Sequence, residues 1–374
     1  MLISACERLQ AAPAILELDN LKAKYAPDSH LGVYSVELEQ DGTNLVLTGE
    51  VDSAQAKIET LAVLARAHVK FTDELAVLPK AELGDRAWGI ATLSVASGRE
   101  QPEHKAEMGT QILMGRSFRV LKSSTNSLWY YVQSADGYLS WLEKGTFTRC
   151  TKGQADAWDH SALLIITVFD ETIRETAQPD SLPVSDVVIA DVVKKIGEEG
   201  DCYKVELPDG RSGYLPKKST EDFATWQAER RANGENIERT AKLFLGRPYL
   251  WGANSPKGLD CSGFAKIVFL LNGIDLRRNA SEQAIEGRAV SLDGDLSQLK
   301  KGDLIFFGGH RRSSGTPHVS HVGIYLGEKL FIQSSERVQI SSLDPHSPLR
   351  DEHRIRTLIS ARRYLPEPGA GAVK

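Results

Sequence analysis

The sequence predicts a multidomain protein in which a small α/β unit and two consecutive β-rich units precede a larger α+β domain. The length of 374 residues exceeds one ordinary compact domain. Hydrophobic residues make up 41% of the chain and charged residues 25%, which are values typical of globular proteins. The spacing of hydrophobic residues changes along the chain: it combines helical and strand-like patterns at first, is strand-like in the middle, and combines both patterns again towards the end. We expect domains at 1–82, 83–150, 151–220 and 221–374.

Net charge and cysteine usage narrow the class of protein further. The formal net charge of −5 argues against a general nucleic-acid binder and suits a small polar substrate. The four cysteines, at positions 6, 150, 202 and 261, are far apart and form no CxxC pair. Neither a zinc site nor a disulfide framework is therefore predicted, and we expect reduced thiols.

The N-terminal stretch favours a protein made without a secretion signal. Glu7 and Arg8 interrupt the sequence before an apolar segment forms, and no run of 18 apolar residues occurs anywhere. We therefore expect a cytoplasmic protein with no membrane contact. An exported protein with a trimmed start would give the same pattern, so that alternative stays open.

The first unit combines two strand-like runs with one helical run. The runs in "VYSVELEQDGTNLVLTGEV" (33–51) surround the Asp41-Gly42 turn, and "DSAQAKIETLAVLARAHV" (52–69) places apolar residues at helical spacing. The "LTGEV" segment followed by a helix resembles a BON domain.

Residues 88–148 and 160–218 share one pattern of short strands and turns without helical periodicity. In the first stretch, "ADGYLSWLEKG" resembles a bacterial SH3 domain, in which a Gly-Tyr turn precedes a strand with a tryptophan. The second stretch ends in another such pair, Gly213-Tyr214. We therefore expect two SH3-like β-barrels in tandem.

The segment "GLDCSGF" (258–264) places a cysteine at the start of a predicted helix. Phe264, Ile267, Val268 and Leu271 follow the spacing of a buried helical face, so Cys261 falls in the first turn. The free N–H groups and the helix dipole there favour a thiolate, the form that acts as a nucleophile. An inert, packed cysteine is the alternative.

A histidine and a glutamine further along the chain complete a plausible catalytic set. His321 heads the first strand of a predicted hairpin and can act as the base for Cys261. Gln333 lies on the returning strand, and its amide oxygen can orient the imidazole.

The turn of this hairpin decides whether the glutamine faces the histidine. A two-residue loop at Gly327-Glu328 would pair His321 with Ser334 and send Gln333 to the opposite face. A three-residue loop or a bulge is therefore required, and Ser334 is the alternative for the third position.

Three motifs in order, "RPYLWGANSPKGLDCSGF", "LKKGDLIFF" and "HVGIYLG", make residues 237–363 resemble the NlpC/P60 family of papain-like cysteine peptidases. The resemblance implies that Cys261 is the nucleophile, His321 the base and Tyr249 a residue of the oxyanion site. Gln333 stands where the family usually has a second histidine. An amide can orient a neutral imidazole, but it cannot stabilise imidazolium as a carboxylate does.

SH3-like barrels ahead of such a domain resemble the γ-D-glutamyl-L-diamino acid endopeptidases. This resemblance implies a murein peptide substrate with a free N-terminal L-Ala. The implied substrate contacts are Asp260 for the ammonium group, Ser262 and Ser281 for the D-Glu α-carboxylate, Trp251 as a pocket wall, and Tyr138 and Glu107 at the amine end.

Neither a metal nor an organic cofactor is expected. His310 and His318 lie close to His321, but no cysteine or carboxylate completes a ligand spacing there. Two other classes stay open: a non-catalytic peptidoglycan-binding protein, and an amidase or acyltransferase on the same scaffold.

Overall fold

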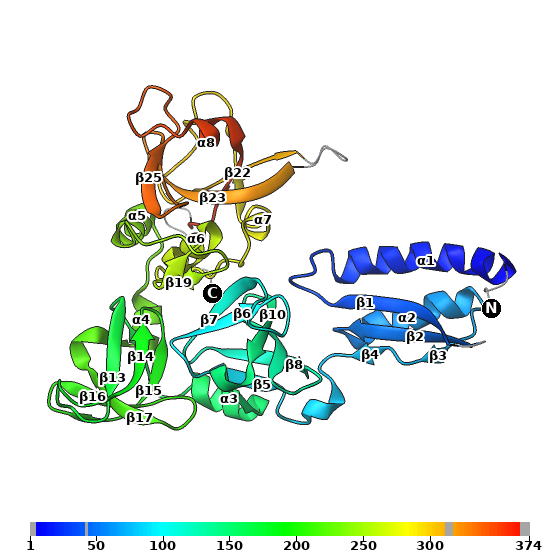
Figure 1. Cartoon of the computed structure of the whole chain (residues 1–374). Helices are drawn as coiled ribbons and strands as arrows, with labels where there is room; N and C mark the ends of the chain where they lie inside the picture. The colour runs from blue at the N-terminus through cyan, green and yellow to red at the C-terminus, as the bar shows by residue number, and fades with distance from the viewer. Residues whose placement is uncertain (1–4, 42–43, 311–316, 367–374) are drawn as a thin grey trace.

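The computed structural model describes residues 5–41, 44–310 and 317–366. The described residues form a four-stranded sheet, two seven-stranded sheets, a two-stranded sheet and a six-stranded sheet in that order (Figure 1). Among the helices of the described residues, none is long and apolar enough to span a lipid bilayer.

The N-terminal unit packs two helices against its sheet. Strands β1 and β2 form an antiparallel hairpin, and β3 and β4 both add to β2 in parallel. Leu47, Val51 and Leu64 are buried in the core between sheet and helices. Helix α1 was not predicted. The elements are α1 (Ala5–Tyr25), β1 (Tyr34–Asp41), β2 (Asn44–Val51), α2 (Ala54–Arg66), β3 (Thr72–Asp73) and β4 (Ala76–Val77).

The first seven-stranded sheet has the strand order β11-β5-β8-β9-β10-β6-β7. Alternating residues point inward, so that Phe118, Val120, Val132 and Leu142 form its core. The elements are η1 (Ala81–Leu83), β5 (Trp88–Ala91), β6 (Val95–Arg99), β7 (Met108–Leu113), β8 (Ser117–Ser123), β9 (Trp129–Gln133), β10 (Leu139–Glu143), η2 (Lys144–Thr146) and β11 (Phe147–Cys150).

The second seven-stranded sheet repeats this topology. Its strand order is β14-β13-β17-β16-β15-β12-β18. When the strands of each sheet are numbered from one to seven along the chain, this sheet read from β18 has the same order as the first sheet read from β11. Helix α3, which was not predicted, connects the two sheets and begins with a capping box at Thr151. The elements are α3 (Lys152–Asp159), β12 (Leu163–Ile166), β13 (Asp170–Arg174), β14 (Pro183–Val188), β15 (Val192–Glu199), β16 (Cys202–Glu206), β17 (Ser212–Pro216), η3 (Lys217–Ser219) and β18 (Thr220–Asp222).

A tight turn of the first sheet inserts into the second. The buried carboxylate of Asp191 accepts a hydrogen bond from the Met114 backbone N–H at 3.0 Å, and Val192 N–H donates to the Met114 carbonyl at 3.0 Å. The indole of Trp158 donates to the Gly115 carbonyl at 2.9 Å. These bonds join the two sheets through the backbone of a single turn.

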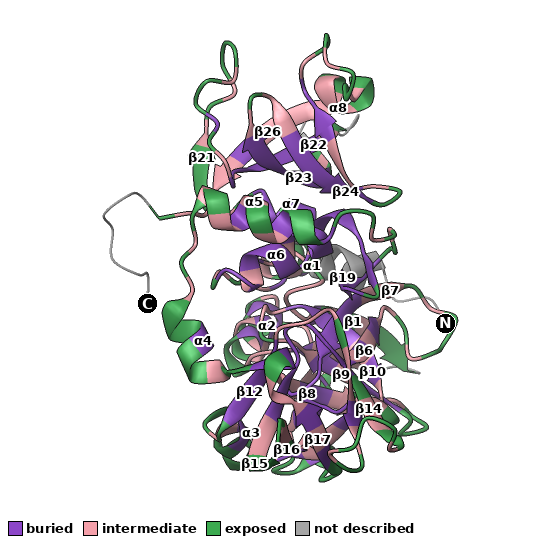
Figure 2. Cartoon of the chain, turned by 90° about the vertical axis from the view of Figure 1, so that its left-hand side faces the viewer, coloured by how far each residue is buried: buried purple, intermediate pink, exposed green. Residues whose placement is uncertain are grey.

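The C-terminal domain places α6 beneath a six-stranded sheet of order β21-β26-β22-β23-β24-β25. Helix α6 is mostly buried, with α5 beside it (Figure 2). Phe264 and Val268 pack with Phe306, Val322 and Ile332 of the sheet. The elements are α4 (Phe223–Glu229), α5 (Gly234–Leu243), β19 (Asn254–Ser255), β20 (Gly258–Leu259), α6 (Cys261–Leu270), α7 (Ala280–Gln283), β21 (Arg288–Val290), β22 (Leu304–His310), β23 (Pro317–Gly327), β24 (Leu330–Ser334), β25 (Val338–Ser342), α8 (Glu352–Thr357) and β26 (Leu358–Arg363).

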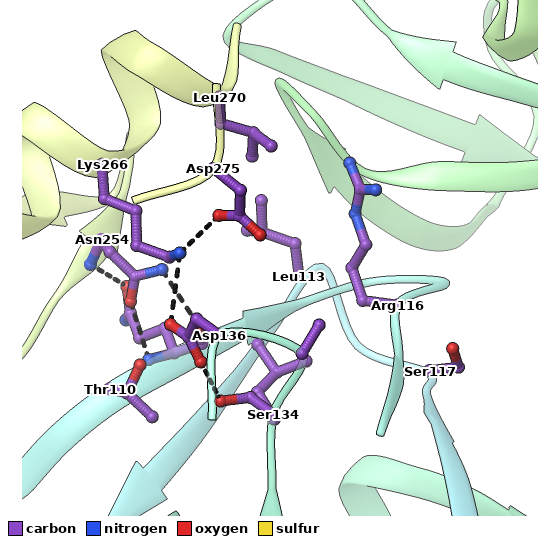
Figure 3. A pocket seen from close by; sticks show the side chains of 13 residues that line it. Thr110, Leu113, Arg116, Ser117, Ser134, Asp136, Asn254, Lys266, Leu270 and Asp275 are labelled. Carbon is purple, nitrogen blue, oxygen red and sulfur yellow. Dashed lines mark hydrogen bonds and ion pairs between the residues drawn. The ribbon is translucent and has the colours of Figure 1, made fainter. Parts of the chain in front are cut away.

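Polar contacts hold this domain against the first seven-stranded sheet. Asn254 and Gln111 exchange hydrogen bonds in both directions, including one of 2.8 Å from the Gln111 backbone N–H to the Asn254 side chain. The ammonium of Lys266 lies 3.2 Å from Asp136 and 2.7 Å from Asp275 (Figure 3). A cavity of about 120 Å³ lies beside these groups. The catalytic helix is thus fixed to the preceding sheet.

We expect Gly115→Ala to lower the melting temperature by several degrees. Gly115 has φ +77°, and a Cβ there would lie 2.1 Å from the carbonyl oxygen of Val192, so the two sheets would have to move apart. Gly145→Ala is the matched control, because no atom lies within 4 Å of its added Cβ. Equal melting temperatures for both variants, measured by calorimetry, would contradict this role of the turn.

Candidate active site

Cys261 is the first residue of α6, as the sequence predicts. The side chain of Asp260 caps the helix by accepting a hydrogen bond of 2.7 Å from the backbone N–H of Gly263. A Cβ at Gly263 would lie 2.1 Å from the carbonyl oxygen of Ala253, so this position requires glycine for close packing of the helix start. Cys261 itself is 8% exposed.

His321 on β23 directly precedes the residue whose backbone approaches the sulfur of Cys261. The backbone N–H of Val322, the following residue, faces the Cys261 sulfur and favours its charged form. The other side of the imidazole contacts the glutamine, because Nε2 of His321 lies 2.7 Å from Oε1 of Gln333. Gln333 therefore lies at the third position that the sequence assigned to it.

The contacts of Gln333 fix the tautomer of the histidine. Its amide nitrogen donates to Asp351 at 3.1 Å and to Ser341 at 3.0 Å, and its oxygen accepts from Arg354 at 3.2 Å. The oxygen must therefore face His321, and Nε2 of His321 must carry the proton. Nδ1 is left unprotonated in the neutral ring, in the form that accepts a proton.

The hairpin contains the predicted bulge. Strands β23 and β24 pair Tyr325 with Phe331, and the register shifts before Gly327 pairs with Leu330. Glu328 and Lys329 form the turn with φ of 51° and 60°. This shift places Gln333 on the face of His321.

Ser334 has a different role from the alternative that the sequence left open. Its hydroxyl donates to the carbonyl oxygen of Leu259 at 2.7 Å and joins β24 to the segment before α6. It is fully buried and does not orient the imidazole.

Burial opposes the thiolate that the helix N-terminus is expected to favour. Burial raises the pKa of Cys261 to about 11, and the adjacent Asp260 carboxylate raises it further. Burial also lowers the pKa of His321 to about 3, assisted by the positive charge of Arg354. The effect of the helix N-terminus is smaller than this loss of hydration. In both groups burial thus favours the neutral form, the thiol of Cys261 and the uncharged imidazole of His321.

Tyr249 lines the same cavity and keeps its proton. Burial raises the pKa of its phenol well above the ordinary value, and the nearby groups Cys261 and Asp260 act in the same direction. A protonated phenol beside the nucleophile can donate a hydrogen bond to a developing oxyanion.

The cavity at Cys261 has a volume of about 490 Å³ and is built from three units of the chain. The lining residues come from the N-terminal unit (His30), the first seven-stranded sheet (Glu100, Glu107, Gly109, Tyr138) and the C-terminal domain (Tyr249, Trp251, Gly252, Asp260, Cys261, Ser262, Arg278, Asn279, Ala280, Ser281, His318, Val319, Ser320).

Asp260 does not have the open carboxylate that was predicted for the substrate ammonium. Its Oδ2 lies 2.5 Å from the guanidinium of Arg278, and it also accepts from the backbone N–H of Gly252 at 3.0 Å. Arg278 is 1% exposed, so the pair is buried. The hydroxyl of Ser262 lies 3.2 Å from Asp260 and 2.9 Å from Arg278. Asp260 and Ser262 are therefore already occupied by an internal network.

The other predicted substrate contacts lie at the cavity, and two of them bridge units. Nε1 of Trp251 donates to Glu107 at 2.5 Å, which links the C-terminal domain to the first seven-stranded sheet. The hydroxyl of Tyr138 donates to Glu100 at 3.1 Å. Ser281 is exposed at the start of α7 and lines the cavity with free access to a ligand.

His318 lines the cavity and is exposed, whereas the side chain of His310 lies outside the described residues. Sequence analysis missed Arg278, Asp351 and Arg354. Of these three residues, Asp351 alone has a local sequence signal, because an aspartate ahead of a polar segment is typical of a helix N-cap. It caps α8 by accepting a hydrogen bond from the backbone N–H of Arg354.

The fold and this site define a papain-like cysteine hydrolase with a Cys-His-Gln arrangement. Residues 246–357 match the NlpC/P60 family and residues 98–145 match the bacterial dipeptidyl-peptidase Sh3 domain. The chain therefore carries an NlpC/P60 domain, the cysteine peptidase domain of that family, behind a bacterial SH3 domain.

Curated relatives are similar over different lengths. Dipeptidyl-peptidase 6 of Lysinibacillus sphaericus is 27% identical over 70% of this chain and 93% of that protein. A gamma-D-glutamyl-L-lysine dipeptidyl-peptidase of Bacillus cereus is 33% identical over 46% of this chain, which spans 48% of that relative. The crystal structure of an NlpC/P60 family protein from Bacillus cereus has a TM-score of 0.62 at 23% identity, covering 75% of this chain and all of that one, and so shows the shared fold.

We expect alkylation of Cys261 by iodoacetamide to accelerate about tenfold per pH unit between pH 7 and pH 10, because the thiolate fraction rises tenfold per unit below a pKa of about 11. Peptide-level mass spectrometry would measure the rate, with the partly exposed Cys202 as an internal control. A rate that stays constant from pH 5 to pH 9 would show a thiolate–imidazolium pair instead.

We expect Gln333→Ala to lower kcat by about 10- to 100-fold, because His321 loses the group that fixes its tautomer. This loss is smaller than that of Cys261→Ala, which removes the nucleophile. Gln333→His keeps a hydrogen-bonding ring and should retain more activity than Gln333→Ala. Wild-type turnover in Gln333→Ala would show that the tautomer does not depend on this amide.

Proposed function

We propose that this chain is a cysteine endopeptidase that hydrolyses the γ-D-glutamyl-L-diamino acid bond of murein peptides with a free N-terminal L-Ala. The observation that carries the proposal is the cavity at Cys261, to which the SH3 domain contributes Glu100, Glu107 and Tyr138. A separate binding domain would leave the cleft open at this end. Two curated relatives are named gamma-D-glutamyl-L-lysine dipeptidyl-peptidase, which supports cleavage of the same type of bond.

The chemistry proceeds from the neutral pair. As the sulfur of Cys261 attacks the γ-carbonyl carbon of D-Glu, its proton passes to Nδ1 of His321, while Gln333 holds Nε2–H in place. The phenol of Tyr249 donates to the oxyanion. His321 then gives its proton to the leaving amine, and a thioester remains. A water molecule hydrolyses the thioester with His321 as base and regenerates the thiol.

Glutamates of the SH3 domain replace Asp260 as the partners of the substrate amine. Glu107 is held in place by the indole of Trp251, and Glu100 by the hydroxyl of Tyr138. Each uses one hydrogen bond to a neutral donor, so its negative charge is available to an ammonium group. The internal pair of Asp260 and Arg278 holds the wall against which the substrate lies.

The repeated strand order supports a second SH3-like unit in this chain. We propose that it supports the first unit through the Met114–Gly115 turn rather than contacting the substrate. Cleavage of free murein peptides would place the enzyme in the recycling of wall fragments in the cytoplasm.

The test compares L-Ala-γ-D-Glu-L-Lys with its N-acetylated form. We expect the wild-type enzyme to prefer the free amine, and Glu107→Gln to lose about tenfold or more in kcat/KM for the free peptide alone, because a charged partner becomes neutral. Glu103→Gln is the matched control, since Glu103 lies in the same loop but outside the cavity. Cys261→Ala sets the background rate. Equal rates on both peptides with the wild-type enzyme would overturn the proposed specificity.

A further inference from the structure

The N-terminal unit reaches the active-site cavity through one histidine. His30 lies in the loop between α1 and β1, and it lines the same cavity as Cys261. Its ring stacks on that of Tyr138, with centroids 5.3 Å apart and an interplanar angle of 17°. A residue far from the catalytic domain in sequence therefore contacts the end of the cavity where Glu100 binds Tyr138.

The loop that carries His30 is anchored on the SH3 domain. The backbone N–H of Leu139 donates to the His30 carbonyl at 2.8 Å, and the side chain of Gln133 donates to the Leu31 carbonyl at 3.3 Å. Val33 packs against a small cluster of buried side chains that includes Leu139. These contacts fix the loop at the histidine and on its C-terminal side.

The orientation of the ring is also fixed. Asp28 accepts hydrogen bonds from the backbone N–H of His30 and from its Nδ1, both at 2.9 Å. Within the described residues, Nε2 of His30 has no hydrogen-bond partner. One ring nitrogen is therefore used to hold the ring, and the other is available to a ligand.

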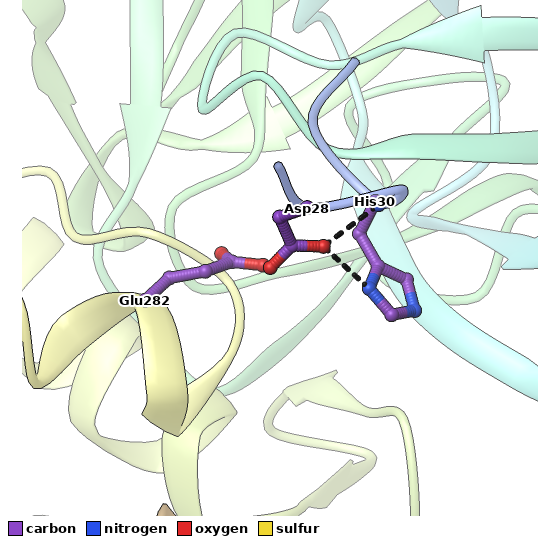
Figure 4. A group of neighbouring side chains, drawn as sticks. All are labelled: Asp28, His30 and Glu282. Carbon is purple, nitrogen blue, oxygen red and sulfur yellow. Dashed lines mark hydrogen bonds and ion pairs between the residues drawn. The ribbon is translucent and has the colours of Figure 1, made fainter. Parts of the chain in front are cut away.

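The same loop meets the catalytic domain at α7. One side-chain nitrogen or oxygen atom from each of Asp28, His30 and the buried Glu282 of α7 lies within 4.8 Å of the other two (Figure 4). Glu282 also closes the capping box at Asn279, a residue that lines the cavity. The N-terminal unit thus lies beside both sides of the cleft: it contacts the SH3 domain through Tyr138 and approaches the catalytic domain at Glu282.

We propose that the N-terminal unit is the third wall of the active site and that His30 is a specificity-determining residue, which limits the substrate to peptides that end at the free amine. This proposal rests on the proposed peptidase function and adds the unit that closes the amine end. A cavity of about 490 Å³ accommodates a short peptide, and the stacked pair of His30 and Tyr138 occupies the space that an acyl group or a longer chain would need.

The first test measures selectivity in the full-length protein. For His30→Ala, the ratio of kcat/KM for the free tripeptide to that for its N-acetylated form should fall about tenfold or more, because the clash with the acetyl group is removed. His30→Phe keeps the stacked ring and should keep the wild-type ratio. Asp28→Ala removes both bonds that orient the ring and should lower the ratio by a smaller factor. His160→Ala is the matched control, on the exposed end of α3.

The second test measures access to Cys261 without using a peptide. The ratio of labelling rates for a bulky fluorescein maleimide and for small iodoacetamide should rise in His30→Ala and stay unchanged in His30→Phe and His160→Ala. Mass spectrometry of the Cys261 peptide gives both rates, and melting temperatures confirm that each variant is folded.

The two tests separate the two proposals. If the wild-type enzyme distinguishes the peptides and His30→Ala keeps both wild-type ratios, the wall proposal is wrong and the proposed function stands. If the wild-type enzyme does not distinguish them, but His30→Ala raises access of the bulky reagent, the substrate specificity and the specificity role of His30 are both wrong, and only the placement of the N-terminal unit as a wall of the cavity stands.

Discussion

The carboxylate of Asp260 is the constraint on which the active site depends. It caps α6, binds the backbone of Gly252 and pairs with the buried guanidinium of Arg278. One side chain therefore sets the start of the helix that carries Cys261 and the position of the loop that faces the SH3 domain. Removing one partner of such a pair leaves a buried charge and costs about 3–5 kcal/mol. An internal role of this kind leaves substrate charge to be recognised by other residues.

The amide side chain of Gln333 suits an uncharged His321. A carboxylate in this place would stabilise imidazolium, whereas burial and Arg354 both disfavour it. Gln333 can orient a neutral ring because Asp351 and Arg354 prevent its amide from turning over. In the proposed mechanism, proton transfer from Cys261 to His321 therefore accompanies attack on the substrate.

Local patterns in the sequence predicted the elements that carry the chemistry, but not the contacts between them. The apolar spacing after Cys261 gave the helix start, and the distance from His321 to Gln333 required the bulge that the hairpin contains. The opposing effect of burial on the thiolate could not be predicted, because the helix dipole is a local property, whereas burial depends on the whole domain. Arg278 and His30 could not be found, because their partners are brought to them only by folding.

The raised pKa of Cys261 also bears on chemical durability. Peroxide attacks thiolates, and at pH 7 a thiol with a pKa of about 11 has a thiolate fraction on the order of 10⁻⁴. The nucleophile would then escape conversion to sulfenic acid under conditions that inactivate peptidases with a permanent thiolate. Electrophilic inhibitors face the same barrier, and those that bind in the cavity long enough for His321 to take the proton would modify the enzyme fastest.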